Sequence, residues 1–171
     1  MSLKILQYPD VSLQKISLEV QDITQDIHNL AKQMVQTMYD AKGVGLAAPQ
    51  VGYLLRLIVV DVSGPEQKSS LLVLINPKIT PVIESGFIEG EEGCLSVPDY
   101  RSKVKRHAKV LLDAIDLDSN PVSFEAEGLL SVCLQHEIDH LDGKLFIDRV
   151  SYLKRKLYDG RLKKRLLKNA I

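Results

Sequence analysis

The chain has no tryptophan, only two cysteines and no net charge among its 171 residues. Its longest aliphatic run covers residues 71–75, far short of the roughly 20 residues of a membrane helix, so we expect no membrane partner. Two cysteines are too few for the disulfide framework of a small secreted protein, and we expect both thiols to be reduced. Lys4 and Pro9 interrupt any signal-type apolar segment at the N-terminus, which favours a cytoplasmic protein.

The zero net charge conceals a separation of charge along the chain. Basic and acidic residues number 22 each, which argues against a DNA-binding protein that is attracted by bulk positive charge. Residues 154–171, however, contain eight lysines and arginines and a single acid, Asp159, so the rest of the chain has an excess of acids. The chain therefore combines an acidic body with a basic C-terminal segment.

Hydrophobic periodicity predicts one helix followed by several strands. Apolar residues recur at spacings of four and three from Ile23 to Met38, and Gly43 favours a stop soon afterwards, which predicts a helix over about 24–41. Four short apolar or alternating segments then predict strands, the first pair joined by a turn at 63–65 and the second pair forming a hairpin. These predicted strands are 56–62, 71–77, 109–117 and 122–128.

The period of the apolar pattern changes after Gly128 and predicts two more helices. The first ends near Gly143, and the second covers about 151–169. The second has leucines that we expect to pack on the body: Leu153, Leu157, Leu162 and Leu166. No linker or repeat separates these segments. We therefore predict a single α+β domain over residues 1–171, with mixed or antiparallel strands around a central helix and helices at both ends.

The predicted central helix contains the sequence His136-Glu137-Ile138-Asp139-His140, an HExxH motif. Histidines four residues apart lie about 6 Å from each other on one helix face, so their imidazoles can share one metal ion. Glu137 is then placed to act on a metal-bound water without being a ligand. The alternative is that these polar residues bind no metal and form a solvent-exposed face of the helix. The surrounding leucines make this helix apolar on most sides, and buried charge without a partner is unfavourable, which argues for a metal site.

A catalytic metal usually takes three protein ligands, and the usual downstream ligand is missing. In the HExxHxxGxxH arrangement the third histidine would stand where this chain has Phe146. No histidine or glutamate follows His140, and Asp148 or Asp159 would require a less common arrangement. A ligand upstream of the motif is therefore favoured.

The two cysteines are the upstream alternatives. Cys133 lies seven residues before His140, roughly 10 Å along a helix axis, so we predict a buried small residue rather than a ligand. Cys94 lies in a segment that glycine and proline keep extended, and such a segment could place a thiolate across the helix. Taken alone, Cys94 is more often a packed core residue.

Three segments together resemble the peptide deformylase family. They match its GxGLAAxQ, EGCLS and QHExDH motifs in the same order and at similar separations, at residues 43–50, 92–96 and 135–140. The resemblance extends over nearly the whole chain, and one departure, Val11 after a Pro-Asp pair, touches none of the chemistry. It implies a hydrolase that removes the formyl group from N-formylmethionine at the start of nascent polypeptides. It also implies Fe²⁺ as the working ion, with Zn²⁺, Ni²⁺ or Co²⁺ as substitutes.

The resemblance also implies which residues perform this chemistry. It places the metal on Cys94, His136 and His140. Glu137 would accept the proton of the attacking water and deliver it to the leaving amine. The oxyanion that forms in the reaction would be stabilised by two donors, the side-chain amide of Gln50 and the backbone N–H of Leu95.

A pocket for the methionine side chain is a further expectation. Gly45 would allow the backbone to approach the substrate closely. The apolar residues that could line such a pocket, each of which could equally be an ordinary core residue, are Val44, Leu129, Val132 and Cys133.

Two other functions use the same residues differently. A zinc endopeptidase would also have the HExxH helix, but the missing downstream ligand argues against it. A non-catalytic binding module stabilised by metal would make Glu137 a structural residue. The basic C-terminal helix is either a solvated amphipathic helix or a contact with ribosomal RNA, since phosphate contacts need lysine and arginine but little sequence specificity.

Overall fold

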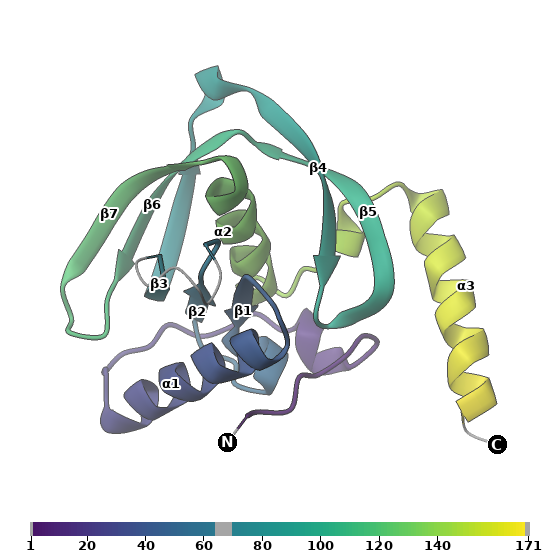
Figure 1. Ribbon diagram of the computed structural model, residues 1–171, viewed down its shortest axis with the longest axis horizontal. Helices are drawn as coiled ribbons and strands as arrows, with labels where there is room; N and C mark the ends of the chain where they lie inside the picture. The colour runs from purple at the N-terminus through teal and green to yellow at the C-terminus, as the bar shows by residue number, and fades with distance from the viewer. Residues whose placement is uncertain (1, 64–69, 170–171) are drawn as a thin grey trace.

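The computed structural model describes residues 2–63 and 70–169 (Figure 1). Within these residues the chain forms three α-helices, four short 3-10 helices and seven strands in two antiparallel sheets. The predicted α+β class is confirmed, and the neighbouring strands of both sheets are antiparallel throughout. No helix in these residues has the length and apolar composition needed to cross a membrane.

The first helix, α1 (Gln25–Asp40), lies within one residue of its predicted limits. Its buried side chains follow the three- and four-residue spacing of the sequence, from Ile27 to Met38, and face the larger sheet. Thr24 precedes the helix in an extended conformation, and the chain leaves the helix at Ala41.

The larger sheet has the strand order β1-β2-β3-β6-β7. Its strands are β1 (Gly45–Ala47), β2 (Leu57–Val60), β3 (Leu72–Pro81), β6 (Lys109–Ile115) and β7 (Pro121–Glu127). All four predicted strands are therefore present. The three residues of β1 are too few to show a period, which is why the sequence did not predict this strand. The predicted turn at 63–65 lies outside the described residues from residue 64 onward.

The apolar run in β2 reflects burial on both faces of this sheet. Leu57 and Val59 belong to the core cluster that includes α1, whereas Ile58 and Val60 belong to the cluster that includes the second helix, α2 (Gly128–Leu141). Alternate residues of a strand point to opposite faces, so helices cover the sheet on both sides.

The smaller sheet is a hairpin of β4 (Phe87–Cys94) and β5 (Val97–His107), and the sequence did not predict it. In β5 the residues alternate between buried and exposed, but the buried positions include Ser102 and Arg106 beside Val104. Polar side chains on the buried face hide the period of two from a hydrophobicity pattern.

The second helix, α2, lies between the larger sheet and the β4–β5 hairpin (Figure 1). Every residue from Cys133 to Leu141 is buried, as predicted from its apolar surroundings. Gly143 follows with a positive φ of 71°, and a Cβ at this position would lie 2.5 Å from the carbonyl oxygen of Gln14. The predicted end of the helix near Gly143 is thus confirmed. Glycine is favoured there because the backbone has a positive φ and because a side chain would collide with Gln14.

The last helix, α3 (Tyr152–Asn169), stands on the outer side of the hairpin, near its predicted limits (Figure 1). The predicted packing face is wrong except for Leu162, because Leu153, Leu157 and Leu166 are 65%, 53% and 47% exposed. The side chains of this helix that are buried against the body are Tyr158 and Leu162.

Ion pairs explain why α3 is rotated from the predicted orientation. Arg155 pairs with Asp148, and Arg165 pairs with Asp99, on either side of the buried Tyr158. The face that contacts the body thus mixes charged and apolar residues, which a pattern of leucines does not reveal.

Candidate metal centre

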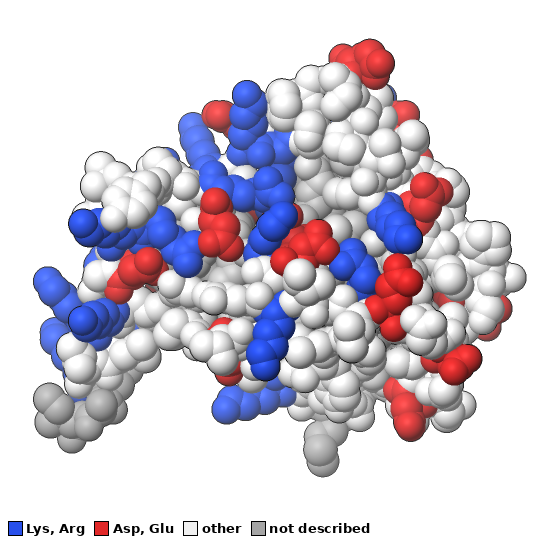
Figure 2. Space-filling view, turned by 180° about the vertical axis from the view of Figure 1, so that it is seen from behind, with Lys and Arg blue, Asp and Glu red and all other residues white. Residues whose placement is uncertain are grey.

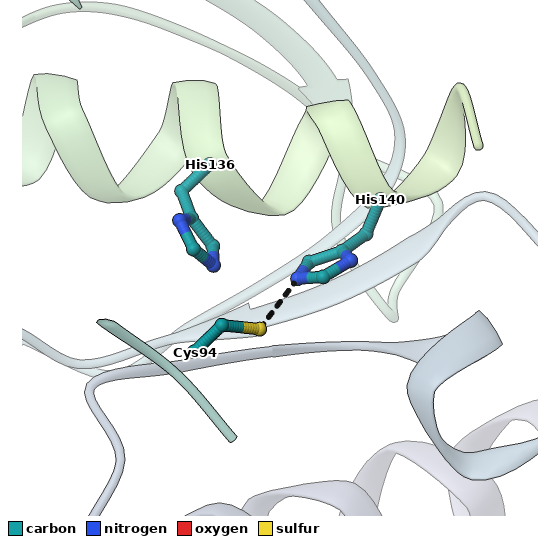
Figure 3. Close-up of side chains that lie close together, drawn as sticks. All are labelled: Cys94, His136 and His140. Atoms are coloured by element: carbon teal, nitrogen blue, oxygen red, sulfur yellow. Dashed lines mark hydrogen bonds between the residues drawn. The ribbon is translucent and has the colours of Figure 1, made fainter. Parts of the chain in front are cut away.

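The helix α2 presents His136 and His140 on one buried face, toward the end of β4. The centroids of the two imidazole rings lie 5.0 Å apart. Cys94, the last residue of β4, lies opposite them, with its Sγ atom 3.3 Å from Nε2 of His140 (Figure 3). One donor atom from each of the three side chains lies within 4.8 Å of the other two. Tertiary structure thus brings together the three residues that the family resemblance implies as ligands.

This cluster fits a divalent metal ion. Ligand bonds of about 2.0–2.3 Å in tetrahedral geometry place donor atoms roughly 3.3–3.7 Å apart, close to the separation of Cys94 and His140. One thiolate and two imidazoles suit a first-row transition metal. The Nδ1 atom of His136 lies 2.9 Å from Oε2 of Glu92, which leaves the Nε2 atom of this ring for the cluster.

The sulfur of Cys94 also faces two N–H donors. The backbone N–H of Ser96 lies 3.4 Å from it, and Nε2 of Gln50 lies 3.5 Å from it. Gln50 is buried in the short helix η2 (Ala48–Val51), where its Oε1 atom accepts a bond from the backbone of Ala47. This bond orients the amide so that its NH₂ group points to the cluster.

Cys133 does not belong to the cluster, in agreement with the distance argument from the sequence. Its side chain is buried, and its thiol donates to the carbonyl oxygen of Val44 at 3.5 Å. Burial raises the pKa of this thiol well above its usual value, and the charge of Glu137 acts in the same direction. A neutral thiol is a poor metal ligand, so Cys133 is a packing residue at the edge of the site.

Glu137 lies beside the cluster without joining it. The carboxyl group is buried, and its Oε2 atom has no hydrogen-bond partner among residues 2–63 and 70–169. Burial raises the pKa of Glu137 to about 7, opposed by the neighbouring His136. A carboxyl group with a pKa near neutrality can both accept and return a proton, as a general acid–base catalyst must.

The structure gives Gly45 a role that the sequence did not suggest. A Cβ added to Gly45 in β1 would lie 2.3 Å from Oε1 of Glu137 and 2.9 Å from Sγ of Cys133. The missing side chain therefore leaves the space that Glu137 occupies. Proximity to the substrate is not needed to explain this glycine.

We expect Gly45→Ala to lower any activity that depends on Glu137 by about 10²-fold, because a displacement of a reacting group by about 1 Å has effects of that size. Thermal unfolding should also occur at a lower temperature, since overpacking destabilises a core by about 1–3 kcal/mol. Gly90→Ala in β4 is the control, because a Cβ there meets no atom within 4 Å. Equal rates for the two variants would contradict the steric argument.

A cavity of about 900 Å³ opens over the cluster. Its walls include Glu137, Gln50 and Leu95 as well as two of the three cluster residues, Cys94 and His136. All five residues predicted for a substrate pocket also line it, namely Val44, Gly45, Leu129, Val132 and Cys133. Val44 and Leu129 are 42% and 57% exposed, so they lie where the cavity meets solvent.

Glu92 and Arg106 belong to the site and were missed by the sequence interpretation. Both are buried, and two bonds of 2.8 and 2.9 Å join the Arg106 guanidinium to the Glu92 carboxylate. Burial alone would raise the pKa of Glu92, but hydrogen bonds from Arg106 and His136 outweigh it and keep the pKa below its usual value. Glu92 stands in the EGCLS segment and could have been suspected, whereas nothing in the sequence distinguishes Arg106.

A largely buried cluster of one half-buried thiol and two imidazoles, a carboxyl group beside it that is not part of the cluster, and a cavity above it together define a metal-dependent hydrolase. Comparisons with known proteins narrow this class. The family model described as polypeptide deformylase matches residues 2–156. The chain belongs to the peptide deformylase family.

The similarity to individual relatives extends over most of the length of each chain. The peptide deformylase of Thermodesulfovibrio yellowstonii is 50% identical over 161 residues, which cover 94% of this chain and 96% of the relative. That of Psychrobacter arcticus is 52% identical over 152 residues, 89% of this chain and 81% of the relative. The crystal structure of a peptide deformylase from Legionella pneumophila superposes with a TM-score of 0.90 at 45% identity, covering 99% of this chain and 98% of that one.

Family membership settles the reaction. Peptide deformylases are metal-dependent hydrolases that remove the N-formyl group from nascent polypeptides, and the chain is an enzyme of this kind. The comparisons support neither the zinc endopeptidase nor the metal-stabilised binding module that the motif alone left open.

Proposed function

We propose that Cys94, His136 and His140 hold a divalent metal ion, Fe²⁺ in the working enzyme, and that residues 1–171 form one catalytic domain. The observation that supports this proposal is the convergence of the three donor atoms within 4.8 Å beneath the cavity. Zn²⁺, Ni²⁺ and Co²⁺ suit the same donors, and intrinsic affinity favours zinc over ferrous iron. Family resemblance is the argument for Fe²⁺.

A bound divalent ion would polarise a carbonyl group and lower the pKa of a coordinated water toward neutrality. Glu137 accepts the proton of the attacking water, because its carboxyl group is adjacent, buried and has a free Oε2 atom. The water oxygen forms a bond to the formyl carbon, and the bond from that carbon to the amine nitrogen then breaks. Glu137 returns the proton to the amine nitrogen, which leaves formate and a free N-terminus.

The oxyanion needs donors that are already oriented. Nε2 of Gln50 is held by the bond between Oε1 and Ala47, and it donates to Ser96 Oγ at 3.1 Å. Gln50 lines the cavity, so this amide would donate to the oxyanion from the orientation it already has. The backbone N–H of Leu95 comes from the adjoining wall. Preoriented donors lower the barrier because no reorganisation is needed as charge develops.

The methionine side chain of the substrate would occupy the apolar part of the cavity. Val132 and Cys133 lie on one side of it on α2, and Val44 and Gly45 face them from the β1 segment. Leu129 stands at the solvent-exposed rim. An apolar wall next to Glu137 would hold the substrate so that its formyl group lies within reach of the carboxyl group.

Anaerobic purification followed by metal analysis and a formate-release assay tests the proposal. We expect one Fe²⁺ for each chain and hydrolysis of a formyl-Met dipeptide, with oxidation of iron or of the thiolate as the route of inactivation. An unformylated peptide should remain intact. Cleavage within that peptide would favour the endopeptidase, and bound metal without formate release would favour the binding module.

We also propose a contact between α3 and ribosomal RNA, which would place the enzyme in the cytoplasm where formylated chains emerge. Figure 2 shows lysine and arginine side chains gathered over α3 and the neighbouring surface. Four exposed bases lie seven, three and four residues apart and thus share one helix face: Lys154, Arg161, Lys164 and Lys168. None of the four forms an ion pair within the described residues, so their charges are available to phosphate groups.

Co-sedimentation with ribosomes over a range of salt concentrations tests this contact. We expect the combined variant Arg161→Glu and Lys164→Glu to bind ribosomes more weakly than wild type. The slope of log affinity against log salt concentration should become less steep by about 2. Lys32→Glu on the exposed side of α1 is the control. Removal of the whole helix is unsuitable, because it also removes Tyr158 and Leu162 from the core. Unchanged binding of the double variant would contradict the proposal.

A further inference from the structure

Arg106 joins two elements of the site through a single buried guanidinium group. Its side chain is 2% exposed and points inward from β5. The Nε and Nη2 atoms donate to the two carboxylate oxygens of Glu92 on β4, at 2.8 and 2.9 Å. The Nη1 atom donates to Oδ2 of Asp139 on α2, at 2.6 Å.

The two carboxylates stand next to the proposed metal ligands. Glu92 precedes Cys94 by two residues on β4, and Asp139 lies between His136 and His140 on α2. Glu92 makes a further contact, because its Oε2 atom also lies 2.9 Å from Nδ1 of His136. A continuous chain of polar contacts therefore runs from the guanidinium to an imidazole of the cluster.

We infer that Arg106 is a positioning residue of the metal centre, which holds the strand of Cys94 against the helix of His136 and His140. The inference rests on the proposed metal site. Arg106 sets the separation of thiolate and imidazoles through Glu92 and Asp139, and it orients the His136 ring through Glu92. The planar guanidinium is suited to this task, because it offers donors in fixed directions to two carboxylates at once.

A purely stabilising ion pair is the competing explanation, and Arg149 makes the distinction possible. Arg149 also binds Asp139, with two bonds of 2.6 Å, but its side chain is 41% exposed, and no hydrogen bond or ion pair joins it to Glu92 within the described residues. Loss of Arg149 removes an ion pair from α2 without releasing β4. Loss of Arg106 releases both elements.

The experiment compares Arg106→Lys with Arg149→Lys in protein loaded with Co²⁺. Lysine keeps the charge but cannot reproduce the fixed set of three bonds that the planar guanidinium makes to Glu92 and Asp139. We expect Arg106→Lys to release Co²⁺ to a chelator about 10–100-fold faster than wild type, the range typical for residues that support metal ligands. The thiolate-to-cobalt absorption band should weaken or shift. Arg149→Lys should change neither measurement appreciably.

Several outcomes would overturn the inference. The inference is wrong if Arg106→Lys releases Co²⁺ at the same rate as wild type and has an unchanged absorption band, even if that variant unfolds at a lower temperature. An equal effect of Arg149→Lys would reduce Arg106 to a stabilising ion pair. If the lysine variant does not fold, Glu92→Gln is judged by the same two measurements. Co²⁺ binding that survives in Cys94→Ala would instead overturn the metal site itself.

Discussion

Replacement of Glu137 by glutamine is expected to lower the rate of formate release by about 10²–10⁴-fold while the metal remains bound, the range typical for loss of a general acid–base group. Glutamine has nearly the same shape but cannot accept the proton of the attacking water. Metal should remain because Glu137 lies outside the three-residue cluster. Steady-state formate release from a formyl-Met dipeptide and metal analysis of the same sample measure both effects.

Glu89→Gln is the matched control for this experiment. Glu89 is exposed on β4 and does not line the cavity, so the same chemical change should leave the rate near that of wild type. Hydrolysis by Glu137→Gln at the wild-type rate would refute the proposed role of this carboxyl group. Loss of metal from the variant would show instead that Glu137 supports the ligands.

Cys94→Ala is expected to lose the metal ion and to release formate no faster than metal-free protein. The sulfur of Cys94 lies 3.3 Å from Nε2 of His140, and the two histidines alone leave an incomplete set of ligands. Cys133→Ala should keep the metal and lose only about 1 kcal/mol of unfolding free energy, a common value for a single substitution. Metal content after dialysis, formate release and thermal unfolding separate the two variants.

The two cysteines control for each other, since the chain has no others. The reverse result, with metal retained in Cys94→Ala and lost in Cys133→Ala, would overturn the ligand assignment. Retention of metal in both single variants would show that neither thiolate is required for metal binding.

Local patterns in the sequence predicted those elements that a single period describes. The helix α1 and the strands of the larger sheet have apolar residues at regular spacing, so their existence follows from burial on one or both faces. The HExxH spacing likewise predicts that His136 and His140 share one face of α2, because helix geometry alone determines this. The β4–β5 hairpin could not be predicted from such a pattern, because the polar residues Arg106 and Ser102 occupy its buried face.

The sequence by itself determined the HExxH helix, the extended segment of Cys94 and, through three motifs, the family. Only the tertiary structure decided that Cys94 meets His140, that Gly45 leaves space for Glu137 and that Arg106 joins β4 to α2. The physical reason is the range of the forces involved. Helix and strand periods arise from neighbours along the chain, whereas a metal centre depends on side chains from distant segments that meet only after the core has packed.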